Sequence, residues 1–229
     1  KRKIAVFTGG GDCPGLNNAI KQVVKSADGK YDVEGITEGW LGACELSLHP
    51  EKAATYTPFL DILAVRRIER EGGTMLMTSR ANPFKYTSED KDVVNCDISD
   101  LVIRTLNQRY HAVVAIGGED TLGAAGKLAA KGLRVVGIPK TIDKDLCGTQ
   151  FTLGFDSALD VASAELNRLR SSAGSHGMVY FVEIMGRRAG HITYHAGVAS
   201  NVHFITIPEV ETDLDRLFYL IQDRKFREK

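Results

Sequence analysis

Short apolar runs alternate with amphipathic segments along this chain of 229 residues. The clearest runs are nearly continuous and rich in β-branched side chains, and they cover residues 4–7, 112–116, 134–138, 179–184 and 203–207. Such runs are typical of strands that are buried on both faces of a parallel sheet. Strands alternating with helical segments predict an α/β fold with helices on both faces of the sheet.

Two segments of the C-terminal half carry apolar residues at helical spacing. One contains Leu159, Ala162, Leu166 and Leu169, and the other contains Leu214, Leu217, Phe218 and Ile221. Thr212 followed by Asp215 predicts a capping box at the start of the last helix. A loop that ends near residues 153–155 indicates a boundary, so we expect one domain over 1–154 and a second over 155–229.

The charge balance limits the kinds of partner. Lys plus Arg and Asp plus Glu each total 29, so the formal net charge is zero. Such a chain has no overall positive field to attract nucleic acid or an anionic membrane. We therefore expect neither partner, and any anionic ligand must be held by local positive groups.

The four cysteines are scattered, at Cys13, Cys44, Cys96 and Cys147. They form no C-x-x-C pair, which favours a reduced, cytoplasmic protein with inert thiols over a zinc or disulfide framework. No stretch is long enough to span a bilayer. The first residues lead directly into an apolar strand, so we expect no signal peptide.

The first loop with candidate chemistry is residues 8–15, TGGGDCPG, between the first predicted strand and a helix that starts near Leu16. Consecutive glycines allow close approach of a ligand and leave backbone N–H groups free for an anion. The following helix N-terminus adds partial positive charge. The alternative is a tight turn that binds nothing.

The second loop, residues 117–121, repeats this design with Gly-Gly-Glu-Asp-Thr. Glu119 or Asp120 could hold Mg²⁺, because this ion prefers oxygen ligands and keeps part of its water shell. Alternatively, Asp120 or Thr121 caps the following helix.

The third loop, residues 139–145, places Asp143 and Asp145 on one side of the chain if it is extended. Two carboxylates near Lys140 are suited to a site in which one of them acts as a base beside a bound phosphate. The alternative is a charged turn that is exposed to solvent and has no catalytic role. Arg187, at the end of run 179–184, and Arg80 are candidate anion-binding side chains. Loops at the carboxyl ends of strands should meet at one edge of the sheet.

These segments resemble the phosphofructokinase family. The similarity covers essentially the whole chain and rests on GGDCPGLN at 10–17, GGTMLMTSR at 72–80, GGEDTLGAA at 117–125, PKTIDKDL at 139–146 and MGRRAG at 185–190. It implies two Rossmann-like three-layer domains with mostly parallel sheets, the second of them incomplete. It also implies a glycolytic, Mg²⁺-dependent kinase that phosphorylates the 1-hydroxyl of fructose 6-phosphate and assembles as a homo-oligomer.

The resemblance implies a role for each matching residue. On the donor side, Arg80 would contact the transferring phosphoryl group and Glu119 would lie near Mg²⁺, and the other donor-binding residues would be Gly11, Asp120, Thr121 and Lys140. Asp143 would accept the proton of the sugar hydroxyl, framed by Thr141 and Asp145. The sugar phosphate would contact Met185, Gly186 and Arg187.

Asp120 and Lys140 bear on the phosphoryl donor. ATP-using members of the family usually have glycine at both matching positions, where a side chain would obstruct the α-phosphate of the nucleotide. Members that use pyrophosphate carry Asp and Lys together, as this chain does. The resemblance therefore implies pyrophosphate as donor, with ATP as the alternative.

Three departures from the family pattern support a further alternative, a non-catalytic regulatory subunit or an inactive fragment. Lys144 stands where an Asn is usual, and Met178 stands where many members have an interfacial Arg. The family also draws part of its sugar site from a segment beyond the position of Lys229. We therefore expect residues 1–229 alone to show little activity.

Overall fold

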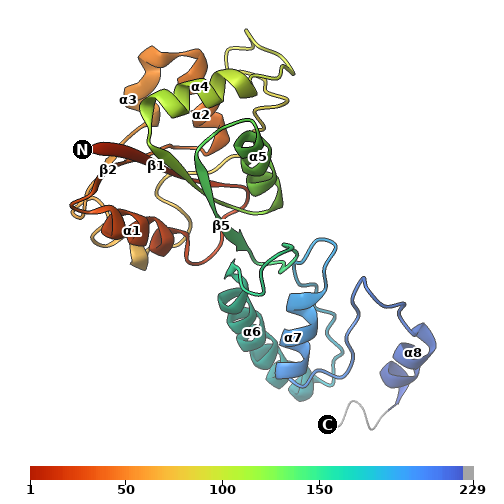
Figure 1. Ribbon diagram of the computed structural model, residues 1–229. Coiled ribbons are helices and arrows are strands. Elements are labelled where there is room, and N and C mark those ends of the chain that lie inside the picture. The colour runs from red at the N-terminus through yellow and green to blue at the C-terminus, as the bar shows by residue number, and fades with distance from the viewer. Residues whose placement is uncertain (224–229) are drawn as a thin grey trace. The chain divides into compact units, whose positions relative to one another are not determined.

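The structure of the protein is a computed structural model, which describes residues 1–223. These residues form two compact units (Figure 1). The first contains residues 1–141 and 146–149, and the second contains residues 142–145 and the chain from 150 onward.

A mostly parallel sheet is the centre of the first unit. Its strands are β1 (Arg2–Gly9), β2 (Tyr31–Gly35), β3 (Phe59–Leu60), β4 (Ala112–Gly117) and β5 (Val135–Thr141), in the spatial order β3-β2-β1-β4-β5. All neighbours pair in parallel except β2 and β3, which are antiparallel. The strands predicted at 4–7, 112–116 and 134–138 are confirmed, as is the α/β class.

Helices cover both faces of this sheet. They are α1 (Leu16–Ala27), α2 (Trp40–Leu48), α3 (Ala53–Tyr56), α4 (Ser99–Arg109) and α5 (Glu119–Ala130), with short 3₁₀ turns η1 (Pro50–Lys52) and η2 (Ile68–Arg70). Figure 1 shows α1 on one face and α2 with α4 on the other. The helix predicted to start near Leu16 is confirmed.

The main core lies between the sheet and α2, α4 and α5. Alternate β1 residues Ala5 and Phe7 are fully buried in it, as strand geometry requires. The Phe7 ring meets Trp40 of α2 edge to face, with ring centroids 4.6 Å apart. Leu106 of α4 completes this contact layer and is also fully buried. Apolar burial of this kind is the main favourable term in folding.

A buried carboxylate ties β2 to the end of α4. Glu34 accepts hydrogen bonds from Lys3 Nζ at 2.7 Å, Tyr110 Oη at 2.8 Å and Arg109 Nη2 at 2.9 Å. Burial alone would raise the pKa of Glu34, but these hydrogen bonds outweigh it and hold the pKa below its usual range.

The second unit is mostly helical. It contains the short strand β6 (Leu153–Gly154) and the helices α6 (Phe155–His176), α7 (His191–Ala199) and α8 (Leu214–Gln222). Helices are confirmed in both segments with helical spacing. The cap of α8 is Asp213, whose carboxylate accepts from Arg216 N at 2.9 Å, so the predicted capping box at Thr212 is wrong. Asp213 directly precedes the first helical residue, where its short side chain reaches the free N–H groups.

The strands predicted at 179–184 and 203–207 are wrong, because neither segment forms a strand in the described chain. A strand needs a hydrogen-bonded neighbour, and apolar pattern alone cannot supply one. Phe181 is 74% exposed, which shows that this run is not enclosed by packed layers. In β5, Val136 is also exposed, at 59%, so burial of that strand on both faces is wrong as well.

Within residues 1–223, no helix has the length and apolar character that crossing a membrane requires.

We predict that Glu34→Gln lowers the free energy of unfolding by about 1–3 kcal/mol at neutral pH, because it weakens several hydrogen bonds to a buried charge. The folded-state pKa of Glu34 is depressed. Its contribution is therefore complete above the unfolded-state value of about 4.3 and is lost as the pH falls through the folded-state value. Chemical denaturation at several pH values measures this difference.

The matched control for this test is Glu71→Gln, at an exposed glutamate of the same unit. It should leave stability nearly unchanged. A Glu34→Gln protein as stable as wild type at pH 7, or a difference that grows on acidification, would contradict the role of Glu34.

Candidate active site

Three loops begin at the same edge of the first unit's sheet. In the strand register, Gly9 at the end of β1 pairs with Gly117 at the end of β4, and Gly117 pairs with Pro139 of β5. The loops after β1, β4 and β5 therefore start side by side, as expected at the carboxyl edge of a parallel sheet.

Thr121 fills the space beneath the first two loops. It is 4% exposed. A Cβ atom on Gly9 would lie 2.5 Å from its Oγ1, and one on Gly117 would lie 2.4 Å from its Cβ. Both glycines are thus required by close packing. The structure places Thr121 as a packing residue, and its predicted contact with the donor stays a prediction.

Backbone and threonine hydroxyl hydrogen bonds join the first loop and β1 to the segment that precedes Arg80. Gly10 N donates to Ser79 O at 2.9 Å, and Thr78 Oγ1 donates to Gly10 O at 2.5 Å. On β1, Thr8 Oγ1 donates to Met77 O at 2.8 Å. Residues 77–79 are therefore fixed along the first loop, and the exposed Arg80 follows them directly.

Lys140 points into the first loop rather than into solvent. It is the penultimate residue of β5 and is 4% exposed. Its Nζ donates to Gly11 O and lies 3.5 Å from the position that a Cβ on Gly10 would take. A buried ammonium group beside backbone of a glycine loop is a fixed positive charge at the sheet edge.

The ammonium group of Lys140 affects the pKa of the nearby Cys13 thiol. Burial raises the pKa of the Cys13 thiol to about 11, and the nearby Lys140 ammonium partly opposes that rise. The thiol therefore stays protonated at neutral pH and is a poor nucleophile. Cys44 is also buried, whereas Cys96 and Cys147 are exposed, and none of the four forms a disulfide.

Glu119 and Asp120 lie in the first turn of α5, and both are exposed. The N-cap of this helix is Gly118, and no side chain caps it. The alternative in which Asp120 or Thr121 caps α5 is therefore wrong. Exposed carboxylate oxygens beside the glycine loops fit the ligand preference of Mg²⁺, so Glu119 can serve as its protein ligand.

Helix α1 begins at the same loop. Its N-cap, Gly15, has φ 94°, and no side chain caps this helix either. Asn17 fixes the helix start against residues 71–75, with Nδ2 donating to Glu71 O and Oδ1 accepting from Met75 N. The free N–H groups of α1 are available to an anion.

Asp143 and Asp145 belong to the second unit. Asp143 is 9% exposed, whereas Asp145 is exposed. Lys144, between them, has φ 57° and places its Nζ 4.7 Å from the centroid of the Phe155 ring. The ring is thus a cation–π partner for this ammonium group.

Residues 185–187, which are predicted to contact the sugar phosphate, form a tight turn. Ala189 N donates to Gly186 O at 2.9 Å, and Arg187 has φ 55°. A Cβ on Gly186 would lie 2.2 Å from Ala189 O, so only glycine fits there. Met185 is 74% exposed, and Arg187 is exposed as well.

Sequence reasoning missed two positioning residues. Trp40 Nε1 donates to Thr121 O at 3.1 Å and fixes the start of α5 against α2. Glu209 Oε1 accepts from Gly190 N at 2.7 Å at the end of the 185–190 turn, and this hydrogen bond lowers the pKa of Glu209. Periodicity gives no signal for either contact, because the partners are 81 and 19 residues apart.

Two curated relatives are similar to most of this chain. A pyrophosphate–fructose 6-phosphate 1-phosphotransferase of Dictyoglomus thermophilum is 45% identical over 219 residues, covering 95% of this chain and 58% of the relative. An ATP-dependent 6-phosphofructokinase of Corynebacterium efficiens is 42% identical over 217 residues, covering 94% of this chain and 58% of the relative. The chain thus spans about three fifths of the length of these curated relatives.

Solved structures show the same fold. A phosphofructokinase from Saccharomyces cerevisiae matches with a TM-score of 0.80 and 26% identity, covering 99% of this chain and 32% of that chain. A pyrophosphate-dependent phosphofructokinase from Marinobacter aquaeolei matches with a TM-score of 0.73 and 18% identity, over 96% of this chain and 56% of that chain. The phosphofructokinase family model matches residues 3–229. Together with the loop geometry at the sheet edge, this match shows that the chain belongs to the phosphofructokinase family.

Proposed function

We propose that this protein transfers a phosphoryl group from pyrophosphate to the 1-hydroxyl of fructose 6-phosphate and so forms fructose 1,6-bisphosphate. Residues 1–154 would hold the donor and Mg²⁺, and residues 155–229 would contribute to the sugar-phosphate site. The named relatives include enzymes that use pyrophosphate and enzymes that use ATP. The choice of donor therefore rests on this chain's own residues.

The buried ammonium of Lys140 is the observation that carries the proposal. It contacts Gly11 O and is almost fully enclosed. Pyrophosphate needs a counter-charge close to its terminal phosphate, and a fixed ammonium in a shielded site supplies one. The exposed Asp120 adds negative charge and bulk where the α-phosphate of a nucleotide would have to pass.

The chain's residues would act mainly by positioning and by neutralising charge, as phosphoryl transfer requires. The N–H groups of the first loop and of α1, together with Arg80 and Lys140, would bind the donor oxygens. Mg²⁺, held through Glu119 and water, would supply further charge neutralisation when bound. Thr121 would keep the two glycine loops in register beneath the donor.

Asp143 is the proposed base for the sugar hydroxyl. It follows two residues after Thr141, the last residue of β5, and it is mostly buried. A carboxylate shielded from water can accept a proton from a hydroxyl that is held within hydrogen-bond reach. Thr141 and Asp145 would frame that hydroxyl. Met185, Gly186 and Arg187 would contact the sugar phosphate from the 185–190 turn.

Cytoplasmic location remains a prediction from the scattered cysteines, and homo-oligomeric assembly remains a prediction from the family resemblance. A non-catalytic regulatory subunit is the second candidate function, favoured by Lys144 and Met178. A protein that binds fructose 6-phosphate but turns over neither donor would establish that alternative.

For the donor, we predict that the natural full-length protein has a kcat/KM for pyrophosphate at least about tenfold above that for ATP, a difference of about 1.4 kcal/mol in transition-state free energy. Asp120→Gly combined with Lys140→Gly should raise ATP use and lower pyrophosphate use. Coupled assays with both donors in parallel measure the ratio.

The matched control for the donor test is Asp28→Gly with Lys30→Gly, because both side chains are exposed outside the glycine loops. It should keep the wild-type ratio. A wild-type preference for ATP, or an unchanged ratio in the Asp120/Lys140 double variant, would refute the donor assignment.

For the base, Asp143→Asn in the full-length protein should reduce kcat by roughly 10²–10⁴-fold with little change in KM, because the amide cannot accept the proton. Steady-state kinetics measures both constants. Asp160→Asn, at an exposed position of α6, is the control and should be near wild type. A folded Asp143→Asn enzyme with wild-type kcat would exclude Asp143 as the base.

For assembly, light scattering of the active full-length protein should give a mass that is a multiple of the single-chain mass. An active protein that is only monomeric at assay concentration would contradict the expected homo-oligomer.

A further inference from the structure

A second group of ligand-type side chains lies at the end of α2 that is distant from the glycine loops. The first turn of α2 packs at the loops, where a Cβ on Gly39 would lie 2.6 Å from Thr8 O. His49 directly follows the last residue of the helix. Nine residues of α-helix span about 13 Å. His49 is therefore well separated from the predicted Mg²⁺ ligand Glu119.

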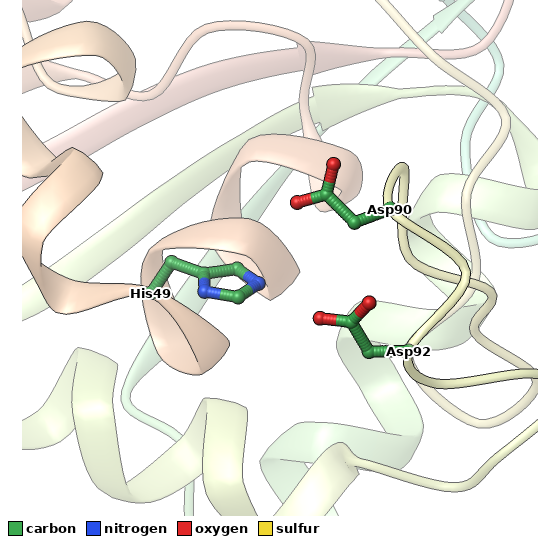
Figure 2. A group of neighbouring side chains, drawn as sticks. All are labelled: His49, Asp90 and Asp92. Atoms are coloured by element: carbon green, nitrogen blue, oxygen red, sulfur yellow. The ribbon is translucent and has the colours of Figure 1, made fainter.

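His49 faces two carboxylates across a narrow space. One ligand atom each from His49, Asp90 and Asp92 lie within 4.8 Å of one another. Figure 2 shows a ring nitrogen of His49 directed toward both aspartates, which come from a neighbouring loop. Ligands of a tetrahedral ion with bonds near 2.1 Å are separated by roughly 3.4 Å, so a small movement of exposed side chains would close the site.

The loop that carries the aspartates is held in place by backbone pairing. Tyr86 and Cys96 form an antiparallel bridge with hydrogen bonds of 2.8 and 2.9 Å. Inside it, Ser88 N donates to Val93 O at 2.8 Å, and Lys91 N donates to Ser88 O at 3.0 Å. The positions of Asp90 and Asp92 are therefore set by the fold, which reduces the entropy lost when a ligand binds.

A buried oxygen of Glu45 that lacks a hydrogen-bond partner lies beside His49. Glu45 has a fully buried side chain, and its Oε1 accepts from Tyr86 Oη at 2.5 Å. Within residues 1–223, its Oε2 is the buried side-chain oxygen that has no hydrogen-bond partner. This oxygen lies 3.9 Å from His49 Nε2 and also 3.9 Å from Lys52 Nζ, so both contacts are longer than a hydrogen bond. A buried acceptor without a partner is costly, and a nearby cation would offset that cost.

The other ring nitrogen of His49 is also placed as in metal sites. Its Nδ1 lies 3.4 Å from Glu51 Oε1. Metal-binding histidines usually donate their second N–H to a carboxylate, which fixes the ring and makes the ligand nitrogen more basic. Partial negative charge at the C-terminal end of α2 also favours a cation near His49.

We propose that His49, Asp90 and Asp92 bind a divalent transition-metal ion of the Zn²⁺ class, with Glu45 as an outer carboxylate and water completing the coordination. One imidazole with carboxylates suits Zn²⁺ better than Mg²⁺, which disfavours nitrogen ligands. The ion would join the end of α2 to the 86–96 loop and so stabilise the first unit. This site is independent of the proposed activity.

The ammonium group of Lys52 would compete with this ion for the carboxylates of Asp90 and Glu45. Its Nζ lies 3.1 Å from Asp90 Oδ2 and 3.9 Å from Glu45 Oε2. The Lys52 side chain is partly exposed, so it can turn toward solvent when the ion enters. Removal of this ammonium group should therefore strengthen metal binding.

The test uses the full chain, freed of metal with a chelator and then titrated with Zn²⁺ in calorimetry and thermal unfolding. We expect one saturable site per chain. A free ion concentration of 100 times the Kd should raise the Tm by roughly 5–10 °C. Mg²⁺ at the same concentration should give a much smaller shift. His49→Gln and Asp92→Asn should each abolish the Zn²⁺-dependent shift, and Lys52→Met should tighten binding several-fold.

Three controls separate this site from other ligands. His176→Gln removes an exposed histidine elsewhere, Cys96→Ser removes the nearest exposed thiol of the loop, and Glu119→Gln removes the predicted Mg²⁺ ligand; all three should retain the Zn²⁺ shift. The proposal is overturned if wild type shows no saturable shift, or if His49→Gln and Asp92→Asn respond like the controls.

Discussion

The close packing of Thr121 against Gly9 and Gly117 is the constraint on which the rest of the carboxyl edge of the first unit's sheet depends. The two glycines pair with each other at the ends of β1 and β4, and neither position has room for a Cβ atom. Thr121 occupies that room and also accepts the indole N–H of Trp40 through its carbonyl. The side chain and the carbonyl of one residue therefore align two glycine loops, the start of α5 and the start of α2.

This alignment gives the edge its electrostatic character. Lys140 extends from the neighbouring strand β5 and is enclosed against Gly11, while α1 and α5 both begin without a side-chain cap. Fixed positive charge and free N–H groups thus face the same loops, an arrangement suited to a phosphate donor. The exposed carboxylates of Glu119 and Asp120 in the first turn of α5 add negative charge beside these loops, and carboxylate oxygens are the ligands that Mg²⁺ prefers.

The two ends of α2 show how one helix can serve two sites. Its first turn is fixed at the glycine loops by Trp40, and its last turn carries Glu45 and ends at His49. Glu45 links that end to the 86–96 loop through Tyr86. Because a helix is rigid over this length, an ion bound at His49 would stabilise α2. The first turn of the same helix contacts Thr121.

The sequence by itself determined the α/β class, the strands at 4–7, 112–116 and 134–138 and the loops that follow them, because apolar period and glycine placement are local signals that do not depend on tertiary contacts. It could also name Lys140, but tertiary structure alone decided that this side chain turns into the loop, since its partner Gly11 is 129 residues away. Runs 179–184 and 203–207 have strand-like composition, yet pairing partners decide whether a strand forms. Glu45, His49 and Asp90 gave no motif, because helix α2 and the 86–96 loop meet only in the folded chain.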